Sequence, residues 1–173
     1  MLHHIGYWVD DLADAVDRAT RTLGVGPFLA HPHVRFDSFQ LADGRAISDP
    51  DYFDHSAVFA AWGPVVLEFD EIHSIAPDLA GAYQVGAGGL GHVSWLADDL
   101  DAESRRLDAL GCRLIHTATS GQVAVAWHDG GGLFPHPIEV HRAGPAIRSM
   151  HARLTALAAG WDGTEPVRPM AAA

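Results

Sequence analysis

The sequence is short of cysteine, of basic residues and of long apolar runs. Its single cysteine, Cys112, excludes an internal disulfide. No apolar run approaches the roughly 20 residues that a membrane-spanning helix needs, and the first residues follow a strand pattern, unlike a leader peptide. The 11 basic residues against 22 acidic ones give a formal net charge of −11, which disfavours nucleic acid and anionic membranes as partners. We therefore expect a cytoplasmic protein that binds neither.

Two stretches of the chain are closely similar. His4-Ile-Gly-Tyr-Trp-Val-Asp-Asp-Leu12 near the start matches His92-Val-Ser-Trp-Leu-Ala-Asp-Asp-Leu100 past the middle. Each is a strand-like run that leads into a helical pattern, so both halves open with the same supersecondary unit. With 173 residues, 48% of them hydrophobic, the chain can bury one core or two small modules fused into one domain. A duplicated unit that carries a histidine each time indicates a paired metal site.

Both halves repeat one order of elements: a strand, a helix and three strands. Asp10 or Asp11 is placed to cap the first helix. The last helix has a stripe of apolar residues that indicates packing on the core more than on a partner chain, and the tail at 160–173 is expected to be poorly ordered. The expected strands are 2–9, 28–36, 53–62, 64–69, 92–97, 112–117, 122–127 and 134–141, and the expected helices are 12–23, 100–110 and 145–159.

The alternation of side chains along four of these strands brings metal-competent groups onto one polar face. Residues two apart on a strand share a face, so His4 falls with Gly6, whereas His3 is expected to lie with Ile5 on the other face. A carboxylate in an apolar strand is costly to bury unless a positive charge pairs with it. The four residues that this pattern selects are two histidines and two glutamates, His4, Glu68, His92 and Glu139.

The pattern resembles the vicinal-oxygen-chelate superfamily, which includes glyoxalase I, methylmalonyl-CoA epimerase, extradiol dioxygenases and bleomycin-resistance proteins. The motifs that carry the resemblance are His4-Ile-Gly-Tyr-Trp-Val-Asp-Asp-Leu, Leu23-Gly-Val-Gly-Pro27, Val66-Leu-Glu-Phe69, Gly91-His-Val-Ser-Trp95 and Pro137-Ile-Glu-Val-His141. The resemblance implies an α+β fold of two tandem βαβββ modules that form a cup-shaped mixed β-sheet with helices on the outer face. It implies one such domain over 1–142, with modules at about 1–70 and 90–142, followed by a C-terminal helix and flexible tail at 143–173.

The resemblance also implies the site and its chemistry. It makes His4, Glu68, His92 and Glu139 ligands of one divalent ion, which is Mg, Mn, Fe, Co, Ni or Zn. The chain would then be an isomerase, epimerase or glyoxalase-type lyase that abstracts a proton next to a carbonyl of a small-molecule substrate and forms an enediolate held by the metal. Glu139 or Glu68 is the favoured base, with His141 and Asp70 next. We also expect a homodimer, and leave open whether the site lies within one chain.

Other readings stay open from the sequence. The chain could be a metal-independent binding or resistance protein with an aromatic cavity, and a ring-cleaving dioxygenase is a less favoured reading, because it would need only two histidines and one glutamate. Four tryptophans are candidates for lining such a cavity, namely Trp8, Trp62, Trp95 and Trp127. Further candidates for substrate contacts, in the long connection of the first half, are His31, His33, Asp54 and His55.

Overall fold

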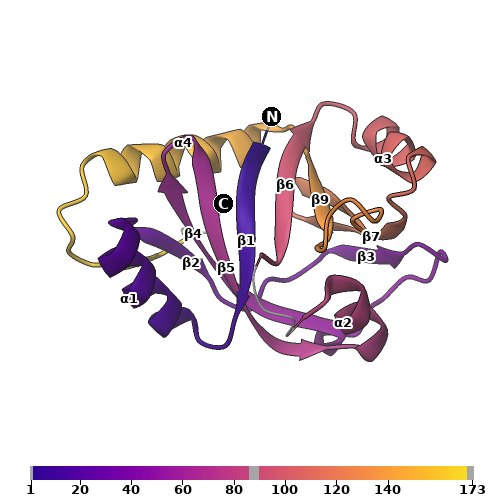
Figure 1. Ribbon diagram of the computed structural model, residues 1–173, viewed down its shortest axis with the longest axis horizontal. Helices are drawn as coiled ribbons and strands as arrows, with labels where there is room; N and C mark the ends of the chain where they lie inside the picture. The colour runs from indigo at the N-terminus through magenta and orange to yellow at the C-terminus, as the bar shows by residue number, and fades with distance from the viewer. Residues whose placement is uncertain (1, 86–89, 171–173) are drawn as a thin grey trace.

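One mixed sheet organises the molecule. The computed structural model describes residues 2–85 and 90–170, and its ten strands run in the order β10-β2-β4-β5-β1-β6-β9-β8-β7-β3. Figure 1 shows β5, β1, β6 and β9 side by side at the middle of the sheet. The sheet curves without closing, and this confirms the predicted α+β class with a cup-shaped sheet. Within the described ranges, no helix combines the length and the apolar character that crossing a membrane requires.

Module 1 has the predicted order, with an additional strand in its connection. The Asp11 side chain accepts a hydrogen bond from Asp14 N at 2.8 Å and caps the first helix, which ends at Gly24 with a left-handed φ of 66°. The repeated elements of the module are β1 (Leu2–Val9), α1 (Leu12–Leu23), β2 (Phe28–His31), β4 (Phe53–Trp62) and β5 (Val65–Ile75).

Module 2 repeats that order with the same capping chemistry. Asp99 accepts a hydrogen bond from Ala102 N at 2.9 Å, as Asp11 does in module 1. Its elements are β6 (His92–Ala97), α3 (Leu100–Ala109), β7 (Leu114–Ser120), β8 (Val123–His128) and β9 (Ile138–Arg142). The duplicated sequence therefore produces a duplicated βαβββ unit.

The register between the modules completes the cup within one chain. Strand β1 pairs in parallel with β5, and β6 pairs in parallel with β9. Strands β1 and β6 pair antiparallel with each other at the middle of the sheet, with His4 opposite Ser94 and Gly6 opposite His92. The first and last strands of both modules are thus the four central strands of the sheet.

Five elements lie outside the duplicated order: helix α4 (Pro145–Ala159), two short helices and two strands. Strand β3 (Ser38–Leu41) leaves module 1 and pairs with β7 at the far edge of module 2, and η1 (Pro50–Tyr52) follows it. Helix α2 (Pro77–Tyr83) connects the modules. Strand β10 (Val167–Pro169) pairs in parallel with β2, so the prediction of a poorly ordered tail is wrong for this segment, which finds its partner at the open edge of the sheet.

The helices cover both faces of the sheet. On the outer face α1 packs Val16 against Leu67, and α3 packs Leu107 against Val140, as the fold prediction requires. Helix α4 (Pro145–Ala159) instead packs Leu154 against Val66 on the inner face. The prediction that the helices lie on the outer face therefore holds for α1 and α3, whereas the apolar stripe of α4 covers the concave side of module 1.

Candidate functional site

The four predicted residues meet on the inner face at the centre of the cup. They come from the four central strands, His4 from β1, Glu68 from β5, His92 from β6 and Glu139 from β9. Alternation turns their neighbours Leu67, Val93 and Ile138 outward. Each of the four is at most 7% exposed. The two-residue alternation in the sequence thus predicts the face on which they lie.

The donor atoms of these residues converge on one point. The Nε2 atom of His4 lies 2.9 Å from Glu68 Oε2, 2.8 Å from Glu139 Oε2 and 2.9 Å from His92 Nε2. His92 Nε2 lies 3.4 Å from Glu68 Oε2 and 3.9 Å from Glu139 Oε2. Two imidazoles and two carboxylates therefore surround a single buried position.

Small residues make room for the imidazoles. A Cβ atom at Gly6 would lie 1.9 Å from His92 Cε1, so only glycine fits opposite this histidine. The corresponding position opposite His4 is Ser94, which is fully buried and whose Oγ makes no hydrogen bond. The sequence signal for this arrangement is the small residue two positions after each histidine.

The carboxylates control the charge of His4. Burial lowers the pKa of the His4 imidazole, but Glu68 and Glu139 outweigh burial and raise this pKa to about 10. Burial raises the pKa of Glu68, but His4 and His92 lower this pKa by more than burial raises it, so the net shift is downward. The pKa of Glu139 is likewise raised by burial and lowered by His141 and His4, with a large net decrease. The two carboxylates and His4 therefore favour each other's charged forms.

His3 belongs to the surroundings of the site, and its predicted place beside Ile5 is wrong. The register shifts between Leu2 and His4, and this bulge turns the His3 ring toward His4. The two Nδ1 atoms lie 2.8 Å apart, and the fully buried His3 ring also approaches the rings of His141 and His151. Burial, followed by the charge of His4, lowers the pKa of His3 to about 3. A bulge carries no local sequence signal here, so the sequence pattern missed this residue.

The two alternative bases also lie on the inner face. His141 Nε2 is 2.9 Å from Glu139 Oε2. Asp70 is 2% exposed, and ligand atoms of Glu68, Asp70 and His92 lie within 4.8 Å of one another. Burial, followed by the charge of Glu68, raises the pKa of Asp70 well above its usual range. Both residues are therefore neighbours of the four-residue site.

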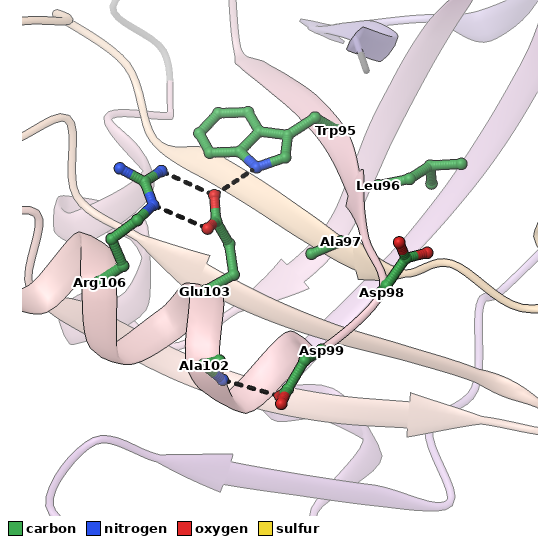
Figure 2. Close-up of a pocket in the computed structure, with 8 residues that line it drawn as sticks. All are labelled: Trp95, Leu96, Ala97, Asp98, Asp99, Ala102, Glu103 and Arg106. Carbon is green, nitrogen blue, oxygen red and sulfur yellow. Dashed lines mark hydrogen bonds and ion pairs between the residues drawn. The ribbon is translucent and has the colours of Figure 1, made fainter.

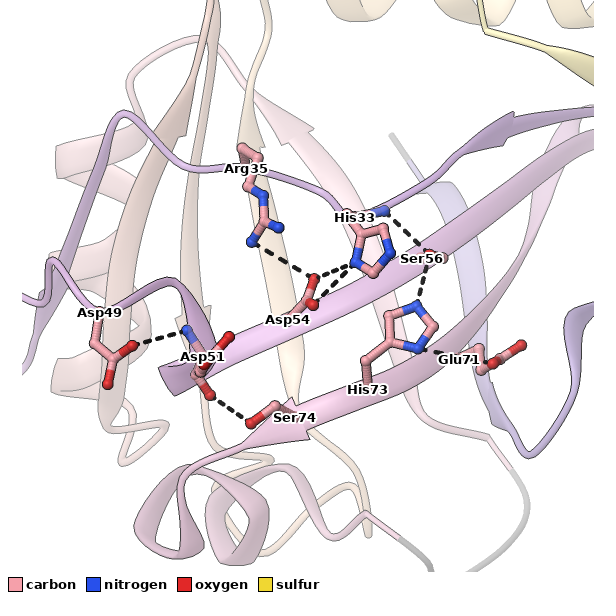
Figure 3. A network of polar contacts seen from close by, with 9 residues as sticks. All are labelled: His33, Arg35, Asp49, Asp51, Asp54, Ser56, Glu71, His73 and Ser74. Atoms are coloured by element: carbon pink, nitrogen blue, oxygen red, sulfur yellow. Dashed lines mark hydrogen bonds and ion pairs between the residues drawn. The ribbon is translucent and has the colours of Figure 1, made fainter.

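The candidates from the long connection form a different network, shown in Figure 3. His33 Nδ1 lies 2.9 Å from Asp54 Oδ2, and its backbone N–H donates to Ser56 Oγ at 3.0 Å. Ser56 Oγ lies 2.7 Å from His73 Nε2, and Glu71 accepts from the backbone N–H of Leu12, the first residue of α1. This network therefore lies toward the α1 side of the sheet.

In the described part of the chain, the remaining histidine candidates, His31 and His55, form no hydrogen bond or ion pair with the four residues. His55 is buried and stacks on Phe53 with a ring separation of 4.3 Å. Burial lowers the pKa of His55 to about 4. His31 on β2 is half-buried, and burial lowers its pKa as well. Neither imidazole joins the donor set.

Two of the four candidate tryptophans line the cup. The Trp8 and Trp127 rings lie 5.6 Å and 4.8 Å from the His92 ring. Trp62 is 42% exposed. Trp95 lies on the outer face, where its Nε1 donates to Glu103 Oε1 at 2.9 Å beside the Glu103–Arg106 ion pair, in the surface pocket of Figure 2. The prediction of a lining of four tryptophans is therefore wrong, because strand alternation turns Trp95 outward.

The donor set fits a divalent cation. Ligands about 2.0–2.2 Å from one ion at neighbouring positions lie about 3 Å apart, and the three contacts of His4 Nε2 are 2.8–2.9 Å long. Glu68 Oε2 is buried, and its close neighbours are the Nε2 atoms of His4 and His92, at 2.9 Å and 3.4 Å, which are themselves metal-competent donors. Mixed nitrogen and oxygen donors suit first-row transition metals and zinc.

Comparison with solved structures supports the fold. The chain is similar to the Mycobacterium tuberculosis methylmalonyl-CoA epimerase, with 20% identity, a TM-score of 0.53 and coverage of 86% of this chain and 91% of that one. A variant of the Streptomyces coelicolor methylmalonyl-CoA epimerase in complex with 2-nitronate-propionyl-CoA matches at 13% identity and a TM-score of 0.56, covering 83% and 96%. A hypothetical protein from Bacillus halodurans matches at 14% and 0.55, covering 83% and 94%.

The family follows from a sequence comparison. No curated protein matches the chain. The model of the Glyoxalase/Bleomycin resistance protein/Dioxygenase superfamily matches residues 3–128, which include three of the four candidate ligands and nearly all of both modules. With the duplicated βαβββ fold described above, this match confirms the predicted resemblance: the chain belongs to the Glyoxalase/Bleomycin resistance protein/Dioxygenase superfamily.

Proposed function

We propose that this protein is a divalent-metal-dependent enzyme that moves a proton next to a carbonyl, as an isomerase, epimerase or glyoxalase-type lyase. The observation that carries the proposal is the convergence of two imidazoles and two carboxylates, from four strands, on one buried point. Membership of the superfamily and the similarity to epimerases support the same class of reaction.

His4, Glu68, His92 and Glu139 would hold the ion. These residues would provide two imidazole nitrogens and two carboxylate groups, a donor set that suits a divalent ion which also binds substrate oxygens. A bound divalent ion would supply a Lewis acid that polarises a substrate carbonyl and increases the acidity of the adjacent C–H group. Mg, Mn, Fe, Co, Ni and Zn are all compatible with this donor set.

The chain also offers groups that can accept and return the proton. A carboxylate oxygen of Glu139 or Glu68 acts as the base at the substrate carbon, since both side chains reach the centre of the cup. His141 Nε2 lies 2.9 Å from Glu139 Oε2, so it orients that carboxylate and can receive the proton that the carboxylate takes from the substrate. Asp70 lies beside Glu68 and is the second group able to exchange a proton there.

A binding protein without chemistry is the second candidate function. The aromatic rings of Trp8 and Trp127 beside His92 favour this reading, because they suit an apolar ligand. The buried carboxylates of the site disfavour this reading, because burying a charged group costs free energy and an apolar ligand would not compensate that cost. A ring-cleaving dioxygenase stays a third, weaker candidate, because two histidines and one glutamate would suffice for it.

Metal content tests the proposal directly. We expect about one divalent ion per chain in wild-type protein purified without chelator, and a loss of that ion in His92→Ala and in Glu139→Ala. The matched control is His128→Gln, a buried histidine that contacts Ser104 and the Cys112 carbonyl on the other side of the sheet. Unchanged metal content in both site variants would eliminate the proposed site.

The chemical step has its own measurement. Metal-loaded wild-type protein should exchange deuterium from solvent into the carbon next to a carbonyl, in a panel of acyl thioesters, hemithioacetals and ketones. If no compound exchanges faster than in the metal-free control while apolar ligands bind tightly, the binding function replaces the enzymatic one. A homodimer stays a prediction, because all four site residues come from one chain and the site therefore does not require a partner. The cytoplasmic location also stays a prediction.

A further inference from the structure

An aromatic cluster occupies the cup beside the candidate metal ligands. The Tyr83 ring stacks on Trp127 at 4.5 Å and on Trp8 at 5.6 Å, with interplanar angles of 26° and 8°. Both tryptophan rings contact His92. Phe39 of β3 completes the cluster and stacks on His116 at 4.1 Å. The His92 ring is therefore bordered by flat aromatic surfaces.

Tyr83 differs from the other members because it does not belong to the sheet. It is the last residue of α2, the short helix between the modules, and is fully buried although its element lies outside both βαβββ units. Its hydroxyl hydrogen-bonds to His116 Nε2, and its carbonyl accepts from Trp8 Nε1 at 3.3 Å. The phenol thus fills a position in the cup that the side chains of the two duplicated units do not fill.

Fixed positive charge is lacking at this position. Every one of the 11 basic residues is an arginine, and each is exposed except Arg168, which is half-buried beside Glu165. Arg35, on the connection before β3, already lies 3.7 Å from the Asp54 carboxylate. The buried cup instead contains Glu68, Glu139 and Asp70. The carboxylates of Glu68 and Glu139 would already balance the charge of a divalent ion, so an anionic substrate would bring a further negative charge with no basic side chain to pair with it.

We propose that the site takes an uncharged, planar aromatic compound with a carbonyl and a neighbouring oxygen, whose ring takes the place of the Tyr83 phenol against Trp8 and Trp127. This inference rests on the proposed function for the oxygen-binding end of the compound. The ring would lie against the tryptophan faces, and the oxygens would reach the point between His4 and His92. Stacking on an aromatic face requires no charge, so this cup distinguishes such a compound from an acid or a phosphate-bearing thioester.

Three compounds separate ring from charge. Phenacyl alcohol is aromatic and neutral, mandelate is aromatic and anionic, and hydroxyacetone is neutral without a ring. We expect calorimetric titration of Co²⁺-loaded wild-type protein to show at least tenfold tighter binding of phenacyl alcohol than of either other compound. Mandelate is intrinsically the better metal ligand, so equal or tighter binding of mandelate would overturn the inference, as would equal binding of hydroxyacetone.

A variant pair tests the place of Tyr83. Tyr83→Ala should bind phenacyl alcohol at least tenfold more tightly than wild type, because the competing phenol is removed. Phe28→Ala, which removes another fully buried ring but under α1, should show no such gain. If Tyr83→Ala does not fold, the three-compound series with wild type still decides. If the protein binds metal but does not prefer phenacyl alcohol, this inference alone is overturned. If the protein does not bind metal, the proposed function is overturned. Titration of the metal-free protein with the same three compounds then decides the inference.

Discussion

The two modules present the same pair of donors to the site but cover their inner faces differently. Module 1 contributes His4 and Glu68, and its concave side is covered by aliphatic residues of α4, such as Leu154 against Val66. Module 2 contributes His92 and Glu139, and its concave side is covered by aromatic residues. The comparison shows that duplicated strands provide the donor set, whereas segments outside the duplication determine what lies next to it.

The support of the two histidines differs as well. His4 Nδ1 lies 2.8 Å from His3 Nδ1, whereas His92 Nδ1 is buried without a hydrogen-bond partner. Position 91, which corresponds to position 3, is Gly91. His92 is instead held by ring contacts with Trp8 and Trp127. One imidazole is thus oriented by a hydrogen bond and the other by aromatic packing.

Exchanging the small residues of the two modules should have the largest effect. In Gly6→Ser the new Cβ would lie 1.9 Å from His92 Cε1, and the neighbouring tryptophans leave that ring little room to move. We expect at least about a hundredfold loss of metal affinity and a loss of about 1–3 kcal/mol in unfolding free energy from overpacking. Titration with Co²⁺ and denaturant unfolding measure both.

The reciprocal exchange is the control for this prediction. Ser94→Gly creates room opposite His4 without removing a hydrogen bond, since Ser94 Oγ has no partner. It should keep its metal affinity within about threefold and lose about 0.5–1 kcal/mol of stability through the flexibility of glycine. Equal metal affinities in the two variants would show that the crowding of His92 is unimportant.

Removing the hydrogen-bonding support of His4 should have a smaller effect. His3→Leu leaves His4 Nδ1 without its partner, and the loss of such an outer partner typically lowers metal affinity about 10- to 100-fold. His3→Gln retains an acceptor and should recover most of that affinity. His151→Ala, at a ring that approaches the His3 ring and is not one of the candidate ligands, is the matched control and should bind metal normally. Equal losses in the Leu and Gln variants, measured by calorimetry, would contradict a positioning role for His3.

Metal affinity should depend on pH through His4. The carboxylates raise the pKa of His4 to about 10, so its imidazole is protonated at neutral pH and must release this proton before Nε2 can bind an ion. Metal affinity should therefore rise about tenfold for each pH unit between about pH 7 and 9, and level off above the pKa. Calorimetry in two buffers of different ionisation enthalpy should show about one proton released per ion. An affinity that is constant over this range would contradict the assignment.

The helix caps should show the smallest effect and an equal one in the two modules. Asp11 and Asp99 each accept one backbone hydrogen bond, at 2.8 Å and 2.9 Å. Asp11→Ala and Asp99→Ala should each lower the free energy of unfolding by about 1 kcal/mol and leave metal affinity unchanged. A difference above about 1 kcal/mol between the two variants in denaturant unfolding would show that the modules differ in cap strength.

Local pattern was sufficient for much of the fold and of the candidate site. The helix bounds of α1 and α4 agree with the predicted ones, because caps and apolar spacing act within a few residues. Alternation placed the four candidate ligands on the polar face, since a strand places every second residue on the same face, and the family resemblance then singled them out as ligands. Their role as metal ligands stays a prediction.

Only the tertiary structure decided which segments enter the cup and how the site is closed. The pairing of β1 with β6 places all four donors in one chain, and the bulge beside His4 turns His3 inward. The crossing of β3 to β7 and the burial of Tyr83 depend on partners far along the chain. Alternation and capping depend on neighbouring residues. Strand pairing, bulges and the side chains that fill the cup depend instead on contacts between segments that lie tens of residues apart in the sequence.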